Sequence, residues 1–243
     1  MPIIAAKLSK KKIVIRFNTA PSKYINHFLK KIFFKYFYAK SNLILVTCED
    51  FKKEIKKFFN LKSIVHRQTL DFEDIKKKSK IRANFDFFRK FKGLKLISIG
   101  RLTHQKDQTT LLKAFSKLIR YRDARLLLLG SGDDKSKLIN FIKKNELEKN
   151  VRIIPYASNP FKYLSLSDIK VLSSRYEGSP NILLETGCLG KLIISSNCKV
   201  GPRETLQFGK GGILFKVGNH NELFLILKKI NINSRRVKKK NRN

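Results

Sequence analysis

The chain has 243 residues, of which 42% are hydrophobic, so it is long enough for one large packed domain or two small ones. Its 54 lysines and arginines against 18 acidic residues give a formal charge of +36, which predicts attraction to phosphorylated substrates, anionic membranes or nucleic acid. Three cysteines exclude a disulfide framework, and the lack of an apolar run of about 18 residues excludes a membrane-spanning helix, so a reduced, cytoplasmic protein is predicted.

Residues 1–92 alternate short apolar runs with lysine-rich helical patterns. Strands are predicted at Lys12–Arg16, Leu43–Thr47 and Ile64–His66, and helices at Ser22–Ala39 and Asp50–Phe59. The lysine-rich segment from Lys76 to Lys92 predicts an exposed linker, which places a domain boundary near residues 85–93.

Within this region, residues 23–40 interleave lysine with Phe, Tyr, Ile and Leu. The pattern fits a basic amphipathic helix on anionic lipid, which would place the protein peripherally at the inner face of a membrane. It fits equally well a helix that packs on the first sheet and turns a lysine face to solvent. Both interpretations stay open.

From Leu94 onward, apolar runs and amphipathic segments alternate regularly, which is typical of βα units that build a parallel sheet. The helices between these runs are expected after Asp107 and from about Asp134. The predicted strands are Leu94–Ile99, Arg125–Leu129, Val151–Ile154, Ile169–Leu172, Leu192–Ser195 and Ile213–Phe215.

Two carboxylates, Glu177 and Glu185, flank a turn that follows the fourth of these strands. Ser179 is predicted to cap a helix that has Pro180 at its first position, and the free N–H groups of that first turn favour a phosphate. Glu185 lies about 8 Å farther along the helix, among apolar residues, so its carboxylate should have a partner. The alternative is that Glu177 merely caps the helix and Glu185 is solvated.

Several short segments occur in an order and spacing that are typical of one family. These segments are Ile99-Gly100-Arg101-Leu102, Gln105-Lys106-Asp107, Asn150-Val151, Asn159-Pro160, Ser167-Asp168, Glu177 to Glu185 and Gly201-Pro202-Arg203-Glu204. Over residues 93 to about 230 the chain thereby resembles the donor-binding domain of family 4 glycosyltransferases. These are retaining, metal-independent enzymes with two Rossmann-like domains, the GT-B architecture.

The resemblance implies that Arg101 and Lys106 hold the diphosphate of a nucleotide-sugar donor. It also implies that Glu177 orients the sugar hydroxyls and that Glu185 accepts a hydrogen bond from the nucleotide ribose. Arg101, Lys106 and Glu177 are therefore expected to be catalytic. The expected donor-binding set is Gly100, Arg101, Lys106, Glu177, Gly178, Ser179, Pro180, Asn181 and Glu185. No Asp-x-Asp pair is evident, so neither a metal site nor a cofactor is expected, and the nucleotide-sugar is a substrate.

The same resemblance implies a partial N-terminal domain with its linker at residues 1–92, a complete C-terminal nucleotide-sugar domain at 93–230, and a basic tail at 231–243. About 90 residues precede the donor domain, roughly half of what such a domain needs. A truncated enzyme, a split enzyme completed by a second polypeptide, and a non-catalytic nucleotide-sugar binder all stay open. The expected acceptor is a sugar, a glycolipid or a polysaccharide intermediate.

The strong basic charge raises one alternative from another class, a nucleic-acid-binding protein. No helix-turn-helix, zinc-ligand or RNA-stacking motif is evident. The charge alone predicts only sequence-independent adhesion that salt would weaken, so no specific nucleic acid partner is expected.

Overall fold

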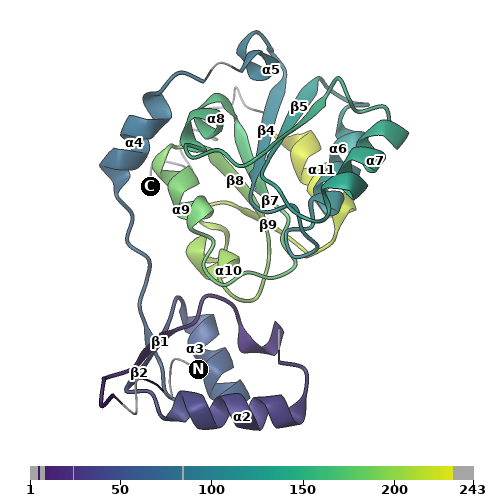
Figure 1. Cartoon of the computed structure of the whole chain (residues 1–243). Coiled ribbons are helices and arrows are strands. Elements are labelled where there is room, and N and C mark those ends of the chain that lie inside the picture. Colours follow the sequence, from purple (N-terminus) through teal and green to yellow (C-terminus); the bar gives the residue numbers. More distant parts are fainter. Residues whose placement is uncertain (1–4, 6–8, 24, 84, 232–243) are drawn as a thin grey trace.

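The computed structural model describes residues 5, 9–23, 25–83 and 85–231, and these residues form two α/β units that are stacked one above the other in Figure 1. Each unit contains one sheet, and every strand pairing in both sheets is parallel. The predicted α/β fold with parallel sheets is confirmed. The predicted basic tail at 231–243 lies outside the described residues beyond Asn231.

The smaller unit holds a three-stranded sheet in the order β1-β2-β3. Its elements are β1 (Val14–Arg16), the 3-10 turn η1 (Pro21–Lys23), α2 (Phe28–Ala39), β2 (Leu43–Val46), α3 (Glu49–Phe59) and β3 (Ile64–Val65). Helix α3 buries Phe51, Ile55 and Phe59, which are spaced four residues apart. Their side chains belong to the hydrophobic core of the unit.

The larger unit holds a six-stranded sheet in the order β6-β5-β4-β7-β8-β9. Its strands are β4 (Leu94–Ile99), β5 (Ala124–Leu129), β6 (Val151–Ile154), β7 (Ile169–Leu172), β8 (Leu192–Ser196) and β9 (Ile213–Phe215), each within one residue of the prediction. The chain adds β5 and β6 on one side of β4 and then adds β7, β8 and β9 on the other. The loops that follow β4 and β7 therefore diverge, and such a switch point is where open α/β sheets bind ligands.

Helices cover both faces of the larger sheet (Figure 1). One face is covered by α6 (Gln108–Leu118), α7 (Lys135–Lys144) and α11 (His220–Lys229), and the other by α5 (Asp86–Arg89), α8 (Phe161–Leu166) and α9 (Asn181–Cys188). Because both faces are buried, the strands read as continuous apolar runs rather than alternating ones.

The exposed linker predicted for Lys76–Lys92 is wrong over its first part. Residues Phe72–Lys80 form a helix, α4, which packs against α8 and α9. The Asp71 carboxylate caps it by accepting the N–H of Asp74 at 2.9 Å, and Ile75 is buried. The lysines are thus the solvent face of an amphipathic helix, and the Asn159 amide anchors its last turn by donating to the carbonyl of Lys78 at 2.9 Å.

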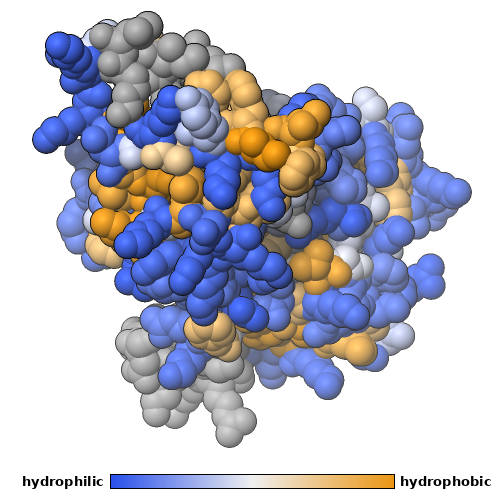
Figure 2. All heavy atoms as spheres, turned by 90° about the horizontal axis from the view of Figure 1, so that it is seen from below, coloured by the Kyte–Doolittle hydropathy of each residue, from blue (hydrophilic) through white to orange (hydrophobic). Residues whose placement is uncertain are grey.

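The continuous helix predicted for Ser22–Ala39 is divided in the structure into η1 and α2. Helix α2 has no fully buried residue. Phe34 and Tyr38 pack against the core of the smaller unit, whereas the opposite side is open to solvent. In the view from below, hydrophobic side chains lie among lysines on the face to which α2 belongs (Figure 2).

The two units touch through the short helix α10 (Pro202–Thr205) and the first turn of α3. The Glu204 carboxylate accepts the backbone N–H groups of Glu49 and Asp50 at 3.1 and 3.2 Å, so a residue of the larger unit caps a helix of the smaller one. Arg203 adds an ion pair to the Asp50 carboxylate at 3.1 Å. The sequence analysis gave Glu204 no role beyond its place in the segment Gly201 to Glu204, and the structure shows that it makes this interdomain contact.

Replacing Glu204 by Ala should lower the free energy of unfolding by about 1–2 kcal/mol, because two helix N–H groups lose a charged acceptor. We expect a fall of about 2–4 °C in Tm per kcal/mol. Differential scanning calorimetry measures it, with Glu148→Ala, an exposed carboxylate of the larger unit, as the control. An equal fall for both variants would contradict the assigned cap.

Candidate functional site

The candidate site lies where the loops that follow β4 and β7 diverge. The first loop starts at Gly100, whose φ of +149° lets the chain turn sharply over the end of the strand. The second loop runs from Ser173 to Pro180. The side chain of Ser173 donates to the carbonyl of Lys106 at 3.0 Å, and the N–H of Arg175 donates to the carbonyl of Gln105 at 2.8 Å. The two loops are therefore joined by direct hydrogen bonds.

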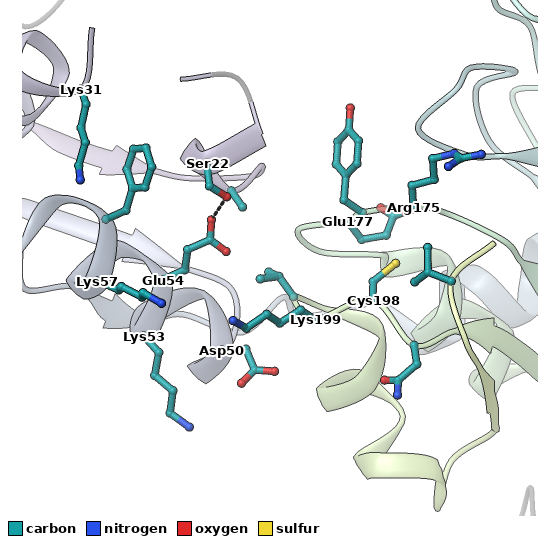
Figure 3. Close-up of a pocket in the computed structure, with 16 residues that line it drawn as sticks. Ser22, Lys31, Asp50, Lys53, Glu54, Lys57, Arg175, Glu177, Cys198 and Lys199 are labelled. Carbon is teal, nitrogen blue, oxygen red and sulfur yellow. Dashed lines mark hydrogen bonds between the residues drawn. The ribbon is translucent and has the colours of Figure 1, made fainter. Parts of the chain in front are cut away.

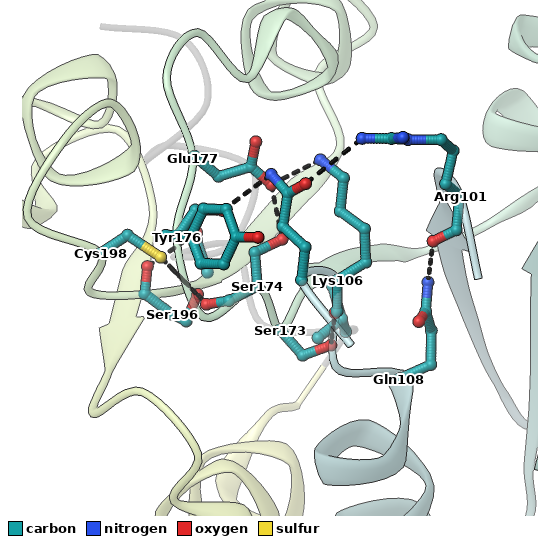
Figure 4. A network of polar contacts seen from close by, with 12 residues as sticks. Arg101, Lys106, Gln108, Ser173, Ser174, Tyr176, Glu177, Ser196 and Cys198 are labelled. Carbon is teal, nitrogen blue, oxygen red and sulfur yellow. Dashed lines mark hydrogen bonds and ion pairs between the residues drawn. The ribbon is translucent and has the colours of Figure 1, made fainter. Parts of the chain in front are cut away.

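At the centre of the site, Lys106 and Glu177 form an ion pair between the two loops, with 2.6 Å between Nζ and Oε1 (Figure 4). Their side chains are only 19% and 6% exposed, so solvent screens the pair little. Ser174 donates to the same carboxylate oxygen at 2.5 Å. Within the described residues Oε2 of Glu177 has no hydrogen-bond partner, and Glu177 lines the cleft described below.

Arg101 lies at the exposed edge of this network. Its guanidinium donates to the Gln105 side chain at 3.3 Å, and Gln105 in turn donates to the carbonyl of Tyr176 at 3.1 Å. Gln108, at the start of α6, fixes the backbone by donating to the carbonyl of Arg101 at 2.8 Å. The structure thus brings Arg101, Lys106 and Glu177 together, with two cations beside one carboxylate.

The start of α9 differs in detail from the prediction. Pro180, not Ser179, occupies the N-cap position, and the Ser179 hydroxyl contacts the Asn181 side chain at 3.1 Å instead of capping a backbone N–H. Pro180 has a non-helical ψ of 75°, so the helix begins one residue later, at Asn181. Gly178, Ser179, Pro180 and Asn181 still form the turn between Glu177 and the helix.

Glu185 does not join the cluster directly. It lies in the second turn of α9, half-buried, and burial raises the pKa of its carboxyl while Lys170 opposes that rise. Lys170 is fully buried in the middle of β7, and its ammonium donates to the carbonyl of Val171 at 2.8 Å. Burial first and Lys106 second lower the pKa of Lys170 to about 7, whereas Glu177 and Glu185 raise it.

Sequence analysis did not single out Lys170, although its position inside an apolar run indicated a buried charge. It is the only charged residue within the run Ile169–Leu172, which reads as a buried strand of a parallel sheet. A lysine is almost never fully buried unless it is paired, and among the described residues no carboxylate lies within hydrogen-bond distance of Lys170. Ser174 and Gln105 carry no comparable signal, because short polar residues are common in loops.

A cleft of about 760 Å³ separates the two units beside this cluster (Figure 3). Its walls are built from both units and are rich in cations. Lys31, Lys53 and Lys57 come from the smaller unit, and Arg175 and Lys199 from the larger one. Asp50, Glu54 and Glu177 also line it.

Gly178 lies at the closest approach of the two units. Its carbonyl accepts a hydrogen bond from the Thr47 hydroxyl at 2.9 Å, and a Cβ at this position would lie 1.8 Å from the carbonyl oxygen of Asn18. Only glycine fits here, because the neighbouring atom is backbone and cannot swing away. The turn that carries the candidate site is therefore pressed against the smaller unit.

The described residues contain neither a metal-binding cluster nor a membrane-spanning helix. No group of three or more His, Cys, Asp or Glu side chains there could hold a metal ion. No helix in the described part of the chain combines the length and apolar character needed to cross a bilayer.

Comparison with known proteins identifies relatives of the chain. Residues 80–243 match the family model for glycosyl transferases group 1. An uncharacterised glycosyltransferase of Methanocaldococcus jannaschii is 35% identical in an alignment of 210 residues that covers 75% of this chain and 50% of that protein. The Campylobacter jejuni enzyme N-acetylgalactosamine-N,N'-diacetylbacillosaminyl-diphospho-undecaprenol 4-alpha-N-acetylgalactosaminyltransferase is 28% identical, over 90% of this chain and 60% of its own length.

Among solved structures, Anabaena HepE in complex with UDP and glucose superposes with a TM-score of 0.84 and 15% identity, over 99% of this chain and 67% of that one. At this identity the likeness concerns the fold alone, and it agrees with the predicted two-domain architecture. The chain spans about half the length of the curated relatives it matches.

Replacing Gly178 by Ala should destabilise the contact between the units by about 1–3 kcal/mol, because the new Cβ overlaps the Asn18 carbonyl oxygen. The matched control is Gly187→Ala in α9, where a Cβ meets no atom within 4 Å. That control should stabilise the helix by about 0.5–1 kcal/mol, since alanine is the better helix former. Chemical denaturation shows whether each substitution lowers or raises the free energy of unfolding. A stabilising Gly178→Ala would contradict the close approach of the two backbones.

Proposed function

Because the chain belongs to the group 1 glycosyl transferases, we propose that it transfers a sugar from a nucleotide-sugar donor to a glycan acceptor, with retention and without a metal ion. The observation that carries the proposal is the cluster of Arg101, Lys106 and Glu177 at the switch point of the larger sheet. The likeness of this site to the motifs of family 4 supports the retaining, metal-independent chemistry.

In this proposal the donor diphosphate lies over Arg101 and Lys106, near the first turn of α9. The guanidinium of Arg101 is exposed and held by one neutral side chain, so it can turn toward a phosphate. Negative charge grows on the diphosphate as the glycosidic bond to the sugar breaks, and these two cations would stabilise it at that moment.

Glu177 would bind the sugar, because one of its oxygens stays available. Lys106 and Ser174 occupy Oε1, which leaves Oε2 to accept from a sugar hydroxyl. The ion pair also fixes the carboxylate before the donor arrives, which lowers the entropy cost of binding. Glu185, in the second turn of α9, would accept a hydrogen bond from a hydroxyl of the nucleotide ribose.

The donor is proposed to carry uridine diphosphate, since the structure of HepE holds UDP and glucose. The acceptor is proposed to be a glycolipid or polysaccharide intermediate. The name of the Campylobacter relative includes a diphospho-undecaprenol acceptor, and the cations that line the cleft suit an acceptor with phosphate groups.

Three alternatives to this proposal remain. A non-catalytic nucleotide-sugar binder would keep Arg101, Lys106 and Glu185 but transfer nothing, and a second polypeptide could complete a split enzyme. A nucleic-acid binder would rest on net charge alone, so its affinity would depend on no single residue of the cluster.

We expect the protein to be stabilised by one family of nucleoside diphosphates and their sugars in a thermal-shift titration at physiological salt. Arg101→Ala and Glu185→Ala should each weaken binding at least tenfold, about 1.4 kcal/mol. The control Arg120→Ala removes an exposed arginine outside the cluster and should bind like the unmodified chain.

Three outcomes of that titration, combined with a sugar-transfer assay on glycolipid acceptors, bear on the alternatives. Equal weakening by Arg101→Ala and Arg120→Ala would favour adhesion through charge. Selective binding without transfer to any glycolipid would leave the non-catalytic binder. No selective stabilisation by uridine, guanosine or adenosine diphosphates would contradict the proposed function.

We propose further that α2 attaches the protein to an anionic membrane surface. At about 100° per residue its exposed apolar side chains fall on one side. They are Phe28, Leu29, Ile32, Phe33 and Tyr36. Exposed Lys30 and Lys35 flank this side, an arrangement that lets the apolar side chains enter the acyl region while the lysines meet anionic headgroups.

Replacing Leu29 and Ile32 by Asp should abolish flotation with vesicles that contain phosphatidylglycerol at low salt, because two charges would enter the apolar contact. Leu225→Asp on α11 alters a residue that is also 50% exposed and should leave flotation unchanged. Absence of flotation by the unmodified chain at low salt would contradict the membrane proposal.

A further inference from the structure

Lys170 is a buried cation that the proposed mechanism has not used. It lies in β7, whose neighbours β4 and β8 place Ile97 and Ile193 beside it. Its side chain is fully buried, and within the described residues its ammonium donates to one acceptor, the carbonyl of Val171 at 2.8 Å. An ammonium has three donors, so this one hydrogen bond leaves two of them without a protein acceptor.

Among the described residues, the charged groups that act most strongly on Lys170 belong to the candidate site and to α9. Lys106 comes from the loop after β4, Glu177 from the loop after β7, and Glu185 from α9. The adjacent strands contribute isoleucines at the paired positions. Lys95, Asp168 and Lys191 form a separate charged group at the amino ends of β4, β7 and β8.

This arrangement is unfavourable for the fold at neutral pH. Burial lowers the pKa of Lys170 to about 7, so Lys170 binds a proton more weakly in the folded chain than in the unfolded chain. Between about pH 7 and about pH 10 the unfolded state binds more protons, so stability falls as the pH drops through this range. An apolar side chain would avoid this loss, which is why a structural role explains the lysine poorly.

We propose that Lys170 is a positioning residue of the donor site, which takes up a proton when a diphosphate binds above it and thereby holds Glu177 and Glu185 in their ionised form. The inference rests on the proposed donor binding. The proton comes from solvent and adds to the free amine at Nζ, while no other bond changes. A diphosphate adds negative charge beside Lys106, which favours the protonated form of Lys170 over the neutral one.

The consequence is a donor affinity that falls as the pH rises. In the free protein Lys170 is largely neutral above pH 7, so binding must include the uptake of a proton there. We expect the affinity to fall on the order of tenfold between about pH 6.5 and about pH 8.5. Nucleotide-sugars suit this measurement, because their diphosphate is esterified at both ends and does not titrate in this range.

The test is isothermal titration calorimetry of UDP-glucose, GDP-mannose and ADP-glucose with the unmodified chain, Lys170→Met and Lys95→Met, in two buffers of different ionisation enthalpy. For the nucleotide-sugar that binds, the unmodified chain and Lys95→Met should show proton uptake and the falling affinity. Lys170→Met should show neither, and its affinity should be lower at pH 6.5. Its melting temperature should be higher at pH 7, with a gain that shrinks toward pH 10.

Each contrary result has a distinct meaning. If the unmodified chain binds none of the three nucleotide-sugars, the proposed function fails and this inference fails with it. If it binds one but shows no proton uptake, or if Lys170→Met keeps the same pH profile, only the inference fails. A Lys170→Met variant that is less stable than the unmodified chain at pH 7 would also overturn it, since Lys170 would then serve the fold.

Discussion

The ion pair between Lys106 and Glu177 is the interaction on which the candidate site depends. It joins the loops that follow two adjacent strands, β4 and β7. These loops run in opposite directions, so the sheet topology alone would leave them apart. Both side chains are largely buried, and removing one would leave the other as an uncompensated charge, which typically costs about 3–5 kcal/mol. Ser174 donates to the same carboxylate oxygen of Glu177, so the pair also fixes that hydrogen bond.

Several features around this pair are unfavourable locally and persist only because the fold supports them. Lys170 is buried without a carboxylate within hydrogen-bond distance. Asp107 adopts a left-handed φ of 44° at the N-cap of α6, where Thr110 and Arg175 hold its carboxylate. Such concentrations of strain and buried charge are typical of functional sites, because a sequence selected for stability alone would remove them.

The sequence predicted the strands of the larger sheet closely, because strands buried on both faces appear as uninterrupted apolar runs with turn residues between them. The resemblance to family 4 also implied that Arg101, Lys106 and Glu177 act on one donor, and the structure shows that they follow adjacent strands, β4 and β7. Besides the buried Lys170 and the division between η1 and α2, three things escaped the sequence analysis. The lysine run of α4 looked like a linker because its one inward residue, Ile75, carries little pattern.

The other two, the start of α9 and the partner of Glu204, depend on how the two units meet. Gly178 touches Asn18 and Thr47, more than a hundred residues earlier, and no local rule contains that contact. The same turn lies next to Glu177, so the surface that joins the units and the surface proposed to bind the donor share one segment. A change in the position of the smaller unit must therefore move the donor loop, and a ligand that fixes the loop must favour one arrangement of the units, because such coupling is reciprocal.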